Sequence, residues 1–365
     1  MPKIVVHELA ELLSGLASPV EWTPGSEAIA DDLFLCALGF EPRCLTVARA
    51  RREGQHRSGR VAYLKYSTNL ADNEANLSEL DACLRAVSKS VEPLETDVAD
   101  FPGRLRALLE LVKTESATRP SVSLDISVMA NRLLLRCVKI LLDYDVSLRI
   151  LYSEAAIYHP TKDEYEREPA KWKTDDVLGL ERGVSDVMPS IDHPGDTLDP
   201  IPDVVLLFPS FKAERSKAII SFVDPSLLNN PGQKVVWLVG APHHDTDRWR
   251  IDAMKTLNEI AVTAKQYEVS TFDYKDTLRV LGELHKELAG AYRLTLSPLG
   301  SKMQALGTAL FCHMHSDVRV IFATPKEYNA AQYSKGCKAI WKIDFGSLVD
   351  VREKLRTVGR LEVVD

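Results

Sequence analysis

The chain has 365 residues, of which 45% are hydrophobic and 27% are charged, and its formal net charge is -7. This length accommodates two domains with a core each, and the composition excludes wholesale disorder. A net negative charge provides no global positive field for duplex DNA, although a local basic pocket for a small anion remains compatible with it.

Six scattered cysteines show neither a C-x-x-C motif nor zinc-like spacing, and the start of the chain lacks a signal-peptide pattern. This usage predicts reduced, mostly buried thiols in a cytoplasmic protein. The most apolar helical stretch, "RLLLRCVKILL", is interrupted by Arg136 and Lys139. It falls short of the roughly 18 apolar residues of a membrane span, so we expect no membrane partner.

An amphipathic helix is predicted near the start, around "HELAELLSGLA", and short apolar runs then alternate with longer helical patterns. Alternation of this kind is typical of a parallel α/β sheet. Five strands are predicted in the first half, at residues 32–39, 60–67, 91–98, 121–127 and 146–153. Five more are predicted in the second half, at residues 203–210, 234–241, 267–274, 292–298 and 318–324.

The two sets of strands pair off in order, at an offset of about 170 residues. Their flanking residues pair as well: Asp31 with Asp203, Arg43 with Arg215, Ser127 with Ser297, Arg132 with Lys302, and Tyr158 with Tyr328. The sequence therefore predicts an α/β protein of two tandem Rossmann-like units, each a mainly parallel sheet flanked by helices. The alternative is a loose alignment of two unrelated α/β domains.

The predicted domain boundaries follow from this repeat. Residues 1–160 form the first Rossmann-like unit with its N-terminal helix, and residues 201–365 form the second. Residues 161–200 are charged and then rich in Pro, Gly and Asp, which is typical of an insertion or linker. Tyr165 and Trp172 indicate that part of this segment packs against something.

The turn after the fourth strand of the second half, "SPLGSKMQALG", has features of a phosphate-binding turn. Ligands of open parallel sheets bind at the carboxyl ends of the strands, where the next helix presents its N-terminus. Gly300 allows close backbone approach, Ser301 supplies a hydroxyl, Lys302 supplies a positive charge, and Gln304 is a candidate contact for a base or ribose. The alternative is a serine-capped helix whose Lys302 faces solvent.

The matching turn of the first half is "DISVMANRLLLR". Ser127, Asn131 and Arg132 are its candidate ligand-binding residues, with Arg132 in the position of Lys302. This turn has no glycine, so it should lie farther from a phosphate, and Lys302 should matter more than Arg132. Alternatively, Asp125 caps the helix and Arg132 is a surface charge.

Each first strand leads into a turn that carries an arginine and a glutamate. "GFEPRC" contains Gly39, Glu41 and Arg43, and "PSFKAERS" contains Glu214 and Arg215. An arginine at this edge of the sheet suits a phosphate or a base edge. Alternatively, each glutamate and arginine form an internal ion pair that fixes the turn.

The run "GAPHHDTDRWR" places His243, His244 and Asp245 side by side after the second strand of the second half. Adjacent residues rarely chelate one metal, and no third ligand has useful spacing, so we expect neither a metal nor a cofactor. A ligand contact or acid–base chemistry remains open for this run, for His243 in particular, and the alternative is a solvated loop. His313 and His315 of "HMH" are interpreted as structural.

Tandem Rossmann-like units with a Gly-(Ser/Thr)-Lys type turn after the fourth strand resemble the CARF and SAVED sensor domains of prokaryotic anti-phage systems. Here "PLGSKMQ" is a partial match to that turn and "SVMANR" is a weaker one. The resemblance implies binding of a cyclic or linear oligonucleotide second messenger in a cleft between the units. Because no effector residues are recognised, it also implies a separate effector protein.

The leading hypothesis is a cytoplasmic nucleotide-sensing subunit of an anti-phage defence system, with no strong catalytic centre of its own. A second hypothesis is a phosphodiesterase-like or nuclease-type enzyme that uses Glu41, Asp125 or His243 as acid or base. A third is a ligand-free scaffold subunit, favoured by the missing glycine in the first-half turn.

Overall fold

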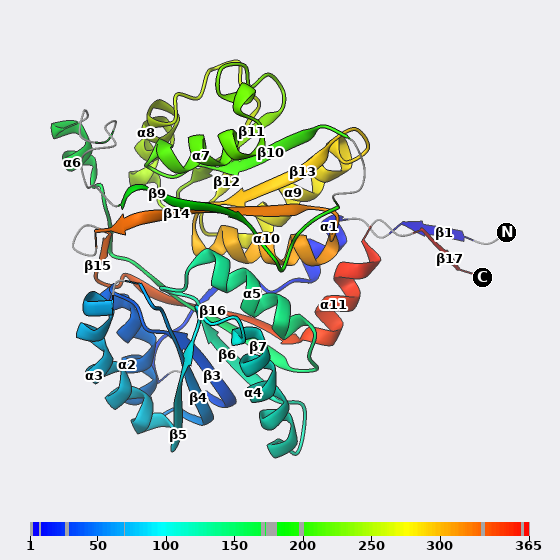
Figure 1. Ribbon diagram of the computed structural model, residues 1–365. Helices are drawn as coiled ribbons and strands as arrows, with labels where there is room; N and C mark the ends of the chain where they lie inside the picture. Colours follow the sequence, from blue (N-terminus) through cyan, green and yellow to red (C-terminus); the bar gives the residue numbers. More distant parts are fainter. Residues whose placement is uncertain are drawn as a thin grey trace. The chain divides into compact units, whose positions relative to one another are not determined.

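The computed structural model describes residues 3–6, 9–25, 29–68, 70–168, 172, 181–196, 201–329, 333–358 and 361–364. The chain divides into two compact units, which we call the first-half unit and the second-half unit (Figure 1). The first-half unit comprises Ser14–Tyr158 and Tyr333–Thr357. The second-half unit comprises Met1–Leu13, His159–Gln332 and Val358–Asp365.

The first-half unit contains a seven-stranded sheet in the order β2-β16-β7-β6-β3-β4-β5. The strands from β7 to β5 are parallel, whereas β2 and β16 are antiparallel to their neighbours. The strand bounds are β2 Val20–Glu21, β3 Ala30–Ala37, β4 Arg57–Lys65, β5 Ser90–Glu95, β6 Ser121–Asp125, β7 Ser147–Glu154 and β16 Ala339–Ser347. A separate two-stranded ribbon pairs β8 (Ile157–Tyr158) with β15 (Ser334–Lys335).

Helices cover both faces of this sheet, with α2 and α3 on one side and α4 and α5 on the other (Figure 1). The helix bounds are η1 Pro42–Leu45 (a 3-10 helix), α2 Thr46–Glu53, α3 Leu70–Val87, α4 Phe101–Glu115, α5 Asn131–Leu142 and α11 Leu348–Thr357. Helix α1, Leu9–Gly15, crosses the boundary between the units in sequence.

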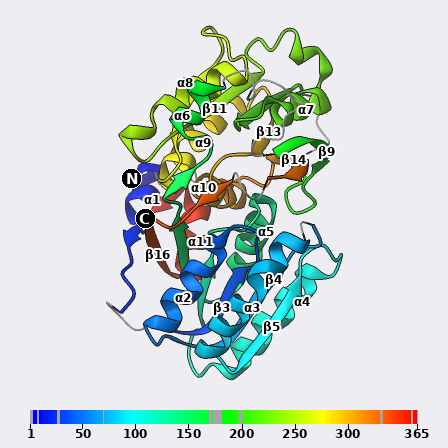
Figure 2. The same ribbon diagram turned by 90° about the vertical axis from the view of Figure 1, so that its left-hand side faces the viewer.

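The second-half unit contains a six-stranded sheet in the order β12-β11-β10-β13-β14-β9. Only β9 is antiparallel to its neighbour, and both views of the molecule show it beside β14 (Figures 1 and 2). The strand bounds are β9 Glu181–Pro189, β10 Asp203–Phe208, β11 Val235–Ala241, β12 Gln266–Ser270, β13 Arg293–Pro298 and β14 Arg319–Tyr328. A separate ribbon pairs β1 (Lys3–Val6) with β17 (Leu361–Val364).

Helices α7 and α8 lie on one face of this sheet, and α9 and α10 lie on the other (Figure 1). The helix bounds are α6 Lys162–Arg167, α7 Ala213–Val223, η3 Pro225–Leu228, η4 Asp245–Asp247, α8 Trp249–Leu257, α9 Tyr274–Leu288 and α10 Lys302–Met314. Within the described residues, no helix is both long and apolar enough to cross a membrane.

Both units repeat one strand order. Numbered along the chain, the five parallel strands run 3-2-1-4-5 in each sheet, which is the order of a Rossmann-like unit. The central strands β3 and β10 are buried over most of their length because helices cover both faces, as expected for parallel strands rich in Val and Leu. The predicted fold class is therefore confirmed, and each of the ten predicted strands overlaps one in the structure.

The limits of the compact units differ from the predicted boundaries. The first-half unit takes β16 and α11 from the end of the chain, because β16 pairs with β7 along most of its length. The second-half unit takes the start of the chain and residues 159–200. Within residues 161–200, the predicted insertion or linker, the described part includes α6, the buried Trp172 and the sheet strand β9. Five of the six cysteines are buried, as predicted.

Candidate functional site

A Rossmann-like sheet has a switch point between its first and fourth parallel strands, where the order of the strands reverses. In the first-half unit this point lies between the carboxyl ends of β3 and β6, and in the second-half unit it lies between those of β10 and β13. All eleven predicted residues lie in the turns that follow these four strands or in the first turn of the next helix. Each unit therefore brings its own candidates to one edge of its sheet.

Arg43 and Glu41 form a buried ion pair in the turn after β3. Arg43 Nη2 lies 2.8 Å from Glu41 Oε2, and both side chains are about 95% buried, at 5% and 6% exposure. Arg43 also donates to the Ser153 carbonyl at 2.7 Å and to Ser334 Oγ at 2.9 Å, and Ser334 Oγ donates to Glu41. Burial alone lowers the pKa of Arg43, but the charge of Glu41 outweighs it and the pKa is raised. The predicted internal pair is observed, and it fixes this turn.

Gly39 lies at the start of the same turn. Its carbonyl accepts hydrogen bonds from Cys44 Sγ at 3.4 Å and from Asn76 Nδ2 at 2.9 Å. A Cβ at this position would come within 3.0 Å of Val128 Cγ2, a side chain from the turn after β6. The glycine therefore lets the two turns of the switch point approach each other.

Asp125 and Ser127 join the end of β6 to β7. Asp125 Oδ1 accepts from the Ser127 backbone N–H at 2.9 Å and from its hydroxyl, and Ser127 Oγ accepts from the Ser153 N–H at 2.8 Å. Burial raises the pKa of Asp125 to about 6. Ser127 is fully buried and engaged within the unit, so this geometry supports a structural role for it.

Asn131 and Arg132 begin α5 and are both partly exposed. The N-cap of this helix is Ala130, whose methyl side chain cannot accept a hydrogen bond. Arg132 Nη2 lies 3.8 Å from Asp97 Oδ1, and the Arg132 side chain is 42% exposed. A surface ion pair at this distance contributes little to stability, and a guanidinium is a suitable partner for a phosphate.

The turn after β13 is a helix cap. Ser301 Oγ accepts from the Gln304 N–H at 3.1 Å, and Gln304 Oε1 accepts from the Ser301 N–H at 2.9 Å, so the two residues form a capping box. Gln304 Nε2 donates to the Val269 carbonyl at 3.1 Å, and the residue is 1% exposed. The predicted contact of Gln304 with a base or ribose therefore competes with internal hydrogen bonds.

Gly300 and Lys302 flank this cap. A Cβ on Gly300 would overlap Gln304 Oε1, so the glycine leaves room for the capping side chain. Lys302 is the first residue of α10 and is partly exposed at the ligand edge of the sheet.

Arg215 pairs with Glu181 rather than with the neighbouring Glu214. Its Nη1 lies 3.2 Å from Glu181 Oε2, and its Nε donates to the Ala323 carbonyl at 3.0 Å. Glu214 instead accepts from the Gly183 N–H at 2.9 Å. The expected local Glu–Arg pair is wrong here because β9, which was not predicted, brings Glu181 to α7.

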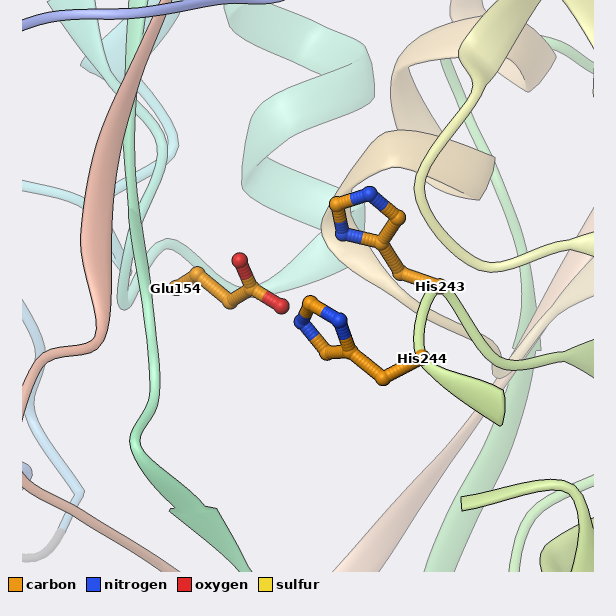
Figure 3. Close-up of side chains that lie close together, drawn as sticks. All are labelled: Glu154, His243 and His244. Atoms are coloured by element: carbon orange, nitrogen blue, oxygen red, sulfur yellow. The ribbon is translucent and has the colours of Figure 1, made fainter. Parts of the chain in front are cut away.

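His243 and His244 follow β11 in the second-half unit, and Glu154 ends β7 in the first-half unit (Figure 3). The ring of His243 stacks on that of Phe272, with 3.8 Å between ring centroids and 8° between planes. Glu154 accepts from Trp341 Nε1 at 2.9 Å within its own unit. The ring stack and the hydrogen bond each hold one of these side chains within its own unit.

A cavity of about 350 Å³ lies beside Arg43 in the first-half unit. Its wall includes Thr46, Arg49 and Glu53, one face of α2, and Cys337 from the segment between β15 and β16. The walls of this cavity are almost 300 residues apart along the chain, so no local sequence pattern predicts it. The spacing of residues 46, 49 and 53 places them on one helix face, which is the signal that the sequence offers.

No protein-family model matches the sequence, and no curated protein matches it. Among solved structures, the chain is similar to the cytoplasmic domain of a prokaryotic cation chloride cotransporter. The match covers 83% of this chain and 99% of that domain. Its sequence identity is 11% and its TM-score is 0.23. A TM-score this low carries no argument about the fold or the function.

Proposed function

We propose that this protein senses a nucleotide second messenger, a cyclic or linear oligonucleotide, and passes the signal to a separate effector protein of an anti-phage system. The observation that supports this proposal is the repeated switch point. Two sheets of the same order each carry polar turns and a helix N-terminus at the edge where open α/β sheets bind phosphate-bearing ligands.

Two positive side chains are the strongest ligand contacts under this proposal. Arg132 in the first-half unit and Lys302 in the second-half unit each lie in the first turn of a helix that follows the fourth parallel strand, and both are partly exposed. Arg43 and Arg215 contribute less, because buried carboxylates already bind them. Breaking those pairs to engage a ligand would leave buried charges without compensation.

The catalytic alternative has less support. Two of its three candidate acid–base residues are already engaged: Asp125 accepts hydrogen bonds from Ser127, and Glu41 accepts them from Arg43 and Ser334. The scaffold alternative is supported by the same internal hydrogen bonds, which explain most of the predicted residues without a ligand.

Titration calorimetry against cyclic di-, tri- and tetranucleotides and linear oligonucleotides tests the proposal. We expect one of them to bind at micromolar concentration or tighter. Arg132→Ala and Lys302→Ala should each weaken that binding by about 10-fold or more, since a hydrogen bond to a charged group contributes about 1.5–3 kcal/mol.

Lys113→Ala and Lys286→Ala are matched controls, because both lysines are exposed in the last turns of helices, at the opposite edge of the sheets. They should leave affinity unchanged. If no nucleotide releases heat or raises the melting temperature, the sensor proposal is wrong and the scaffold alternative stands. Turnover of a bound nucleotide that Asp125→Asn abolishes would favour the enzyme instead.

A further inference from the structure

We propose that His285, His315 and Asp317 of the second-half unit form a binding site for a divalent transition metal ion of the Zn²⁺ type. Each residue offers one ligand atom, and these atoms lie within 4.8 Å of one another. The cluster is separate from the turns discussed above: His285 is in the last turn of α9, and the other two residues follow the end of α10.

The backbone holds the three side chains on fixed elements. His315 is the C-cap of α10, and its N–H donates to the Phe311 carbonyl at 3.0 Å. Asp317 lies two residues later, where the Asp196 N–H donates to its carbonyl at 3.0 Å. Helices α9 and α10 pack side by side (Figure 1), and His285, from the last turn of α9, contacts His315 and Asp317. A ligand set fixed in this way needs little ordering when a metal binds.

The ligand atoms of the three side chains lie within 4.8 Å of one another, so side-chain rotation has to bring them closer around one metal ion. His285 Nε2 lies 2.8 Å from Asp317 Oδ2, and the two imidazole rings are 3.7 Å apart between centroids with 30° between their planes. Zinc bonds of about 2.0–2.1 Å in a tetrahedron place ligand atoms about 3.3 Å apart. The ion would take the place of the proton between His285 and Asp317. A rotation of the His315 ring would then bring one of its nitrogens to the ion.

The chemistry of the three groups favours a transition metal over Ca²⁺ or Mg²⁺. Two imidazoles and one carboxylate are ligands typical of zinc and related ions, whereas calcium and magnesium prefer oxygen ligands. With three protein ligands, a tetrahedral ion would keep one position for water.

Titration of the full chain with ZnCl₂ at pH 7.5, after treatment with a chelator, tests the site. We expect one equivalent to bind with micromolar affinity or tighter. His315→Gln and Asp317→Asn should each weaken binding by at least 10-fold. The Asn side chain can still accept the hydrogen bond from His285, so Asp317→Asn separates loss of the metal ligand from loss of folding.

His313→Ala is the matched control, since it removes a histidine from the last turn of the same helix, outside the cluster. It should leave zinc affinity unchanged. A second comparison uses the His243→Ala, His244→Ala double variant, because these two residues are another pair of neighbouring imidazoles in the second-half unit. If that variant abolishes binding while His315→Gln does not, or if the wild-type chain binds no zinc, the proposal is wrong.

Discussion

Asp125 is a buried carboxyl group whose ionisation should be visible in the stability of the protein. Burial raises its pKa to about 6 from an ordinary value of 3.8. The folded protein therefore binds a proton that the unfolded chain releases between about pH 4 and pH 6. Its contribution to the free energy of unfolding is complete below about pH 4 and is lost as the pH rises through about 6.

Asp125→Asn isolates this effect, because the carboxamide oxygen can still accept both hydrogen bonds from Ser127. The free energy of unfolding of the variant minus that of wild type should rise by up to about 3 kcal/mol between pH 4 and pH 6. Above pH 6 this difference should stay constant. Urea unfolding at several pH values measures the difference. A difference that does not change with pH would contradict the raised pKa.

Asp32→Asn serves as a control of opposite sign. Hydrogen bonds from Ser121 outweigh the effect of burial and lower the pKa of Asp32. The stability that this carboxylate contributes is present above its ordinary pKa and is lost as the pH falls through the lowered value.

At the scale of elements, the start of α10 depends on a glycine for a packing reason. Gly300→Ala would push a methyl group into Gln304 Oε1, which caps the Ser301 N–H. We expect a loss of about 1–3 kcal/mol in the free energy of unfolding. Gly290→Ala is the control, because a methyl group there would meet no described atom within 4 Å.

A double-mutant cycle in urea unfolding checks the stated cause. In a Gln304→Ala background, where the obstructing oxygen is gone, Gly300→Ala should cost less, with a coupling of about 0.5–3 kcal/mol. Equal costs in the two backgrounds would mean that Gln304 is not the reason for the glycine.

The glycine at the start of α10 has a different role from the one that the sequence suggests. The sequence predicted that Lys302 matters more than Arg132 because only its turn contains a glycine. In the structure that glycine accommodates the capping box of α10, whereas α5 begins at Ala130, whose side chain cannot cap it. An anion at the start of α5 would not compete with a side-chain cap, so we now expect Arg132 to matter at least as much as Lys302.

At the scale of the whole molecule, the second-half unit interrupts the first. Strand β16 pairs with β7, and Leu348, Val351 and Leu355 of α11 are buried. Residues 14–158 alone should therefore leave the edge of β7 and part of the core uncovered. Tyr158 pairs with Ser334 in the β8–β15 ribbon, so a short Gly-Ser linker can join residue 158 to residue 333.

We expect the joined chain, 14–158 with 333–357, to unfold cooperatively as a monomer, and residues 14–158 alone to aggregate or unfold without cooperativity. Circular dichroism melts and size-exclusion chromatography measure both. Cooperative unfolding of residues 14–158 by themselves would show that β16 and α11 are dispensable.

Local sequence patterns predict the parallel cores and the positions of the polar turns. Runs such as "DLFLCALG" and "DVVLLFPS" are apolar because both faces of a parallel strand are covered, and their order identified two Rossmann-like units. Local hydrophobicity carries this information, so all ten parallel strands were predicted.

The antiparallel edge strands and the partners of the charged groups depend on contacts between residues far apart in the sequence. Strand β9, "ERGVSDVMP", is charged and half exposed, and it became a strand because Val184 and Val187 pack against the second-half core. Arg43 meets Ser334, and Arg215 meets Glu181, across 291 and 34 residues of sequence. Such contacts depend on which strand pairs with which edge, and no local pattern encodes that choice.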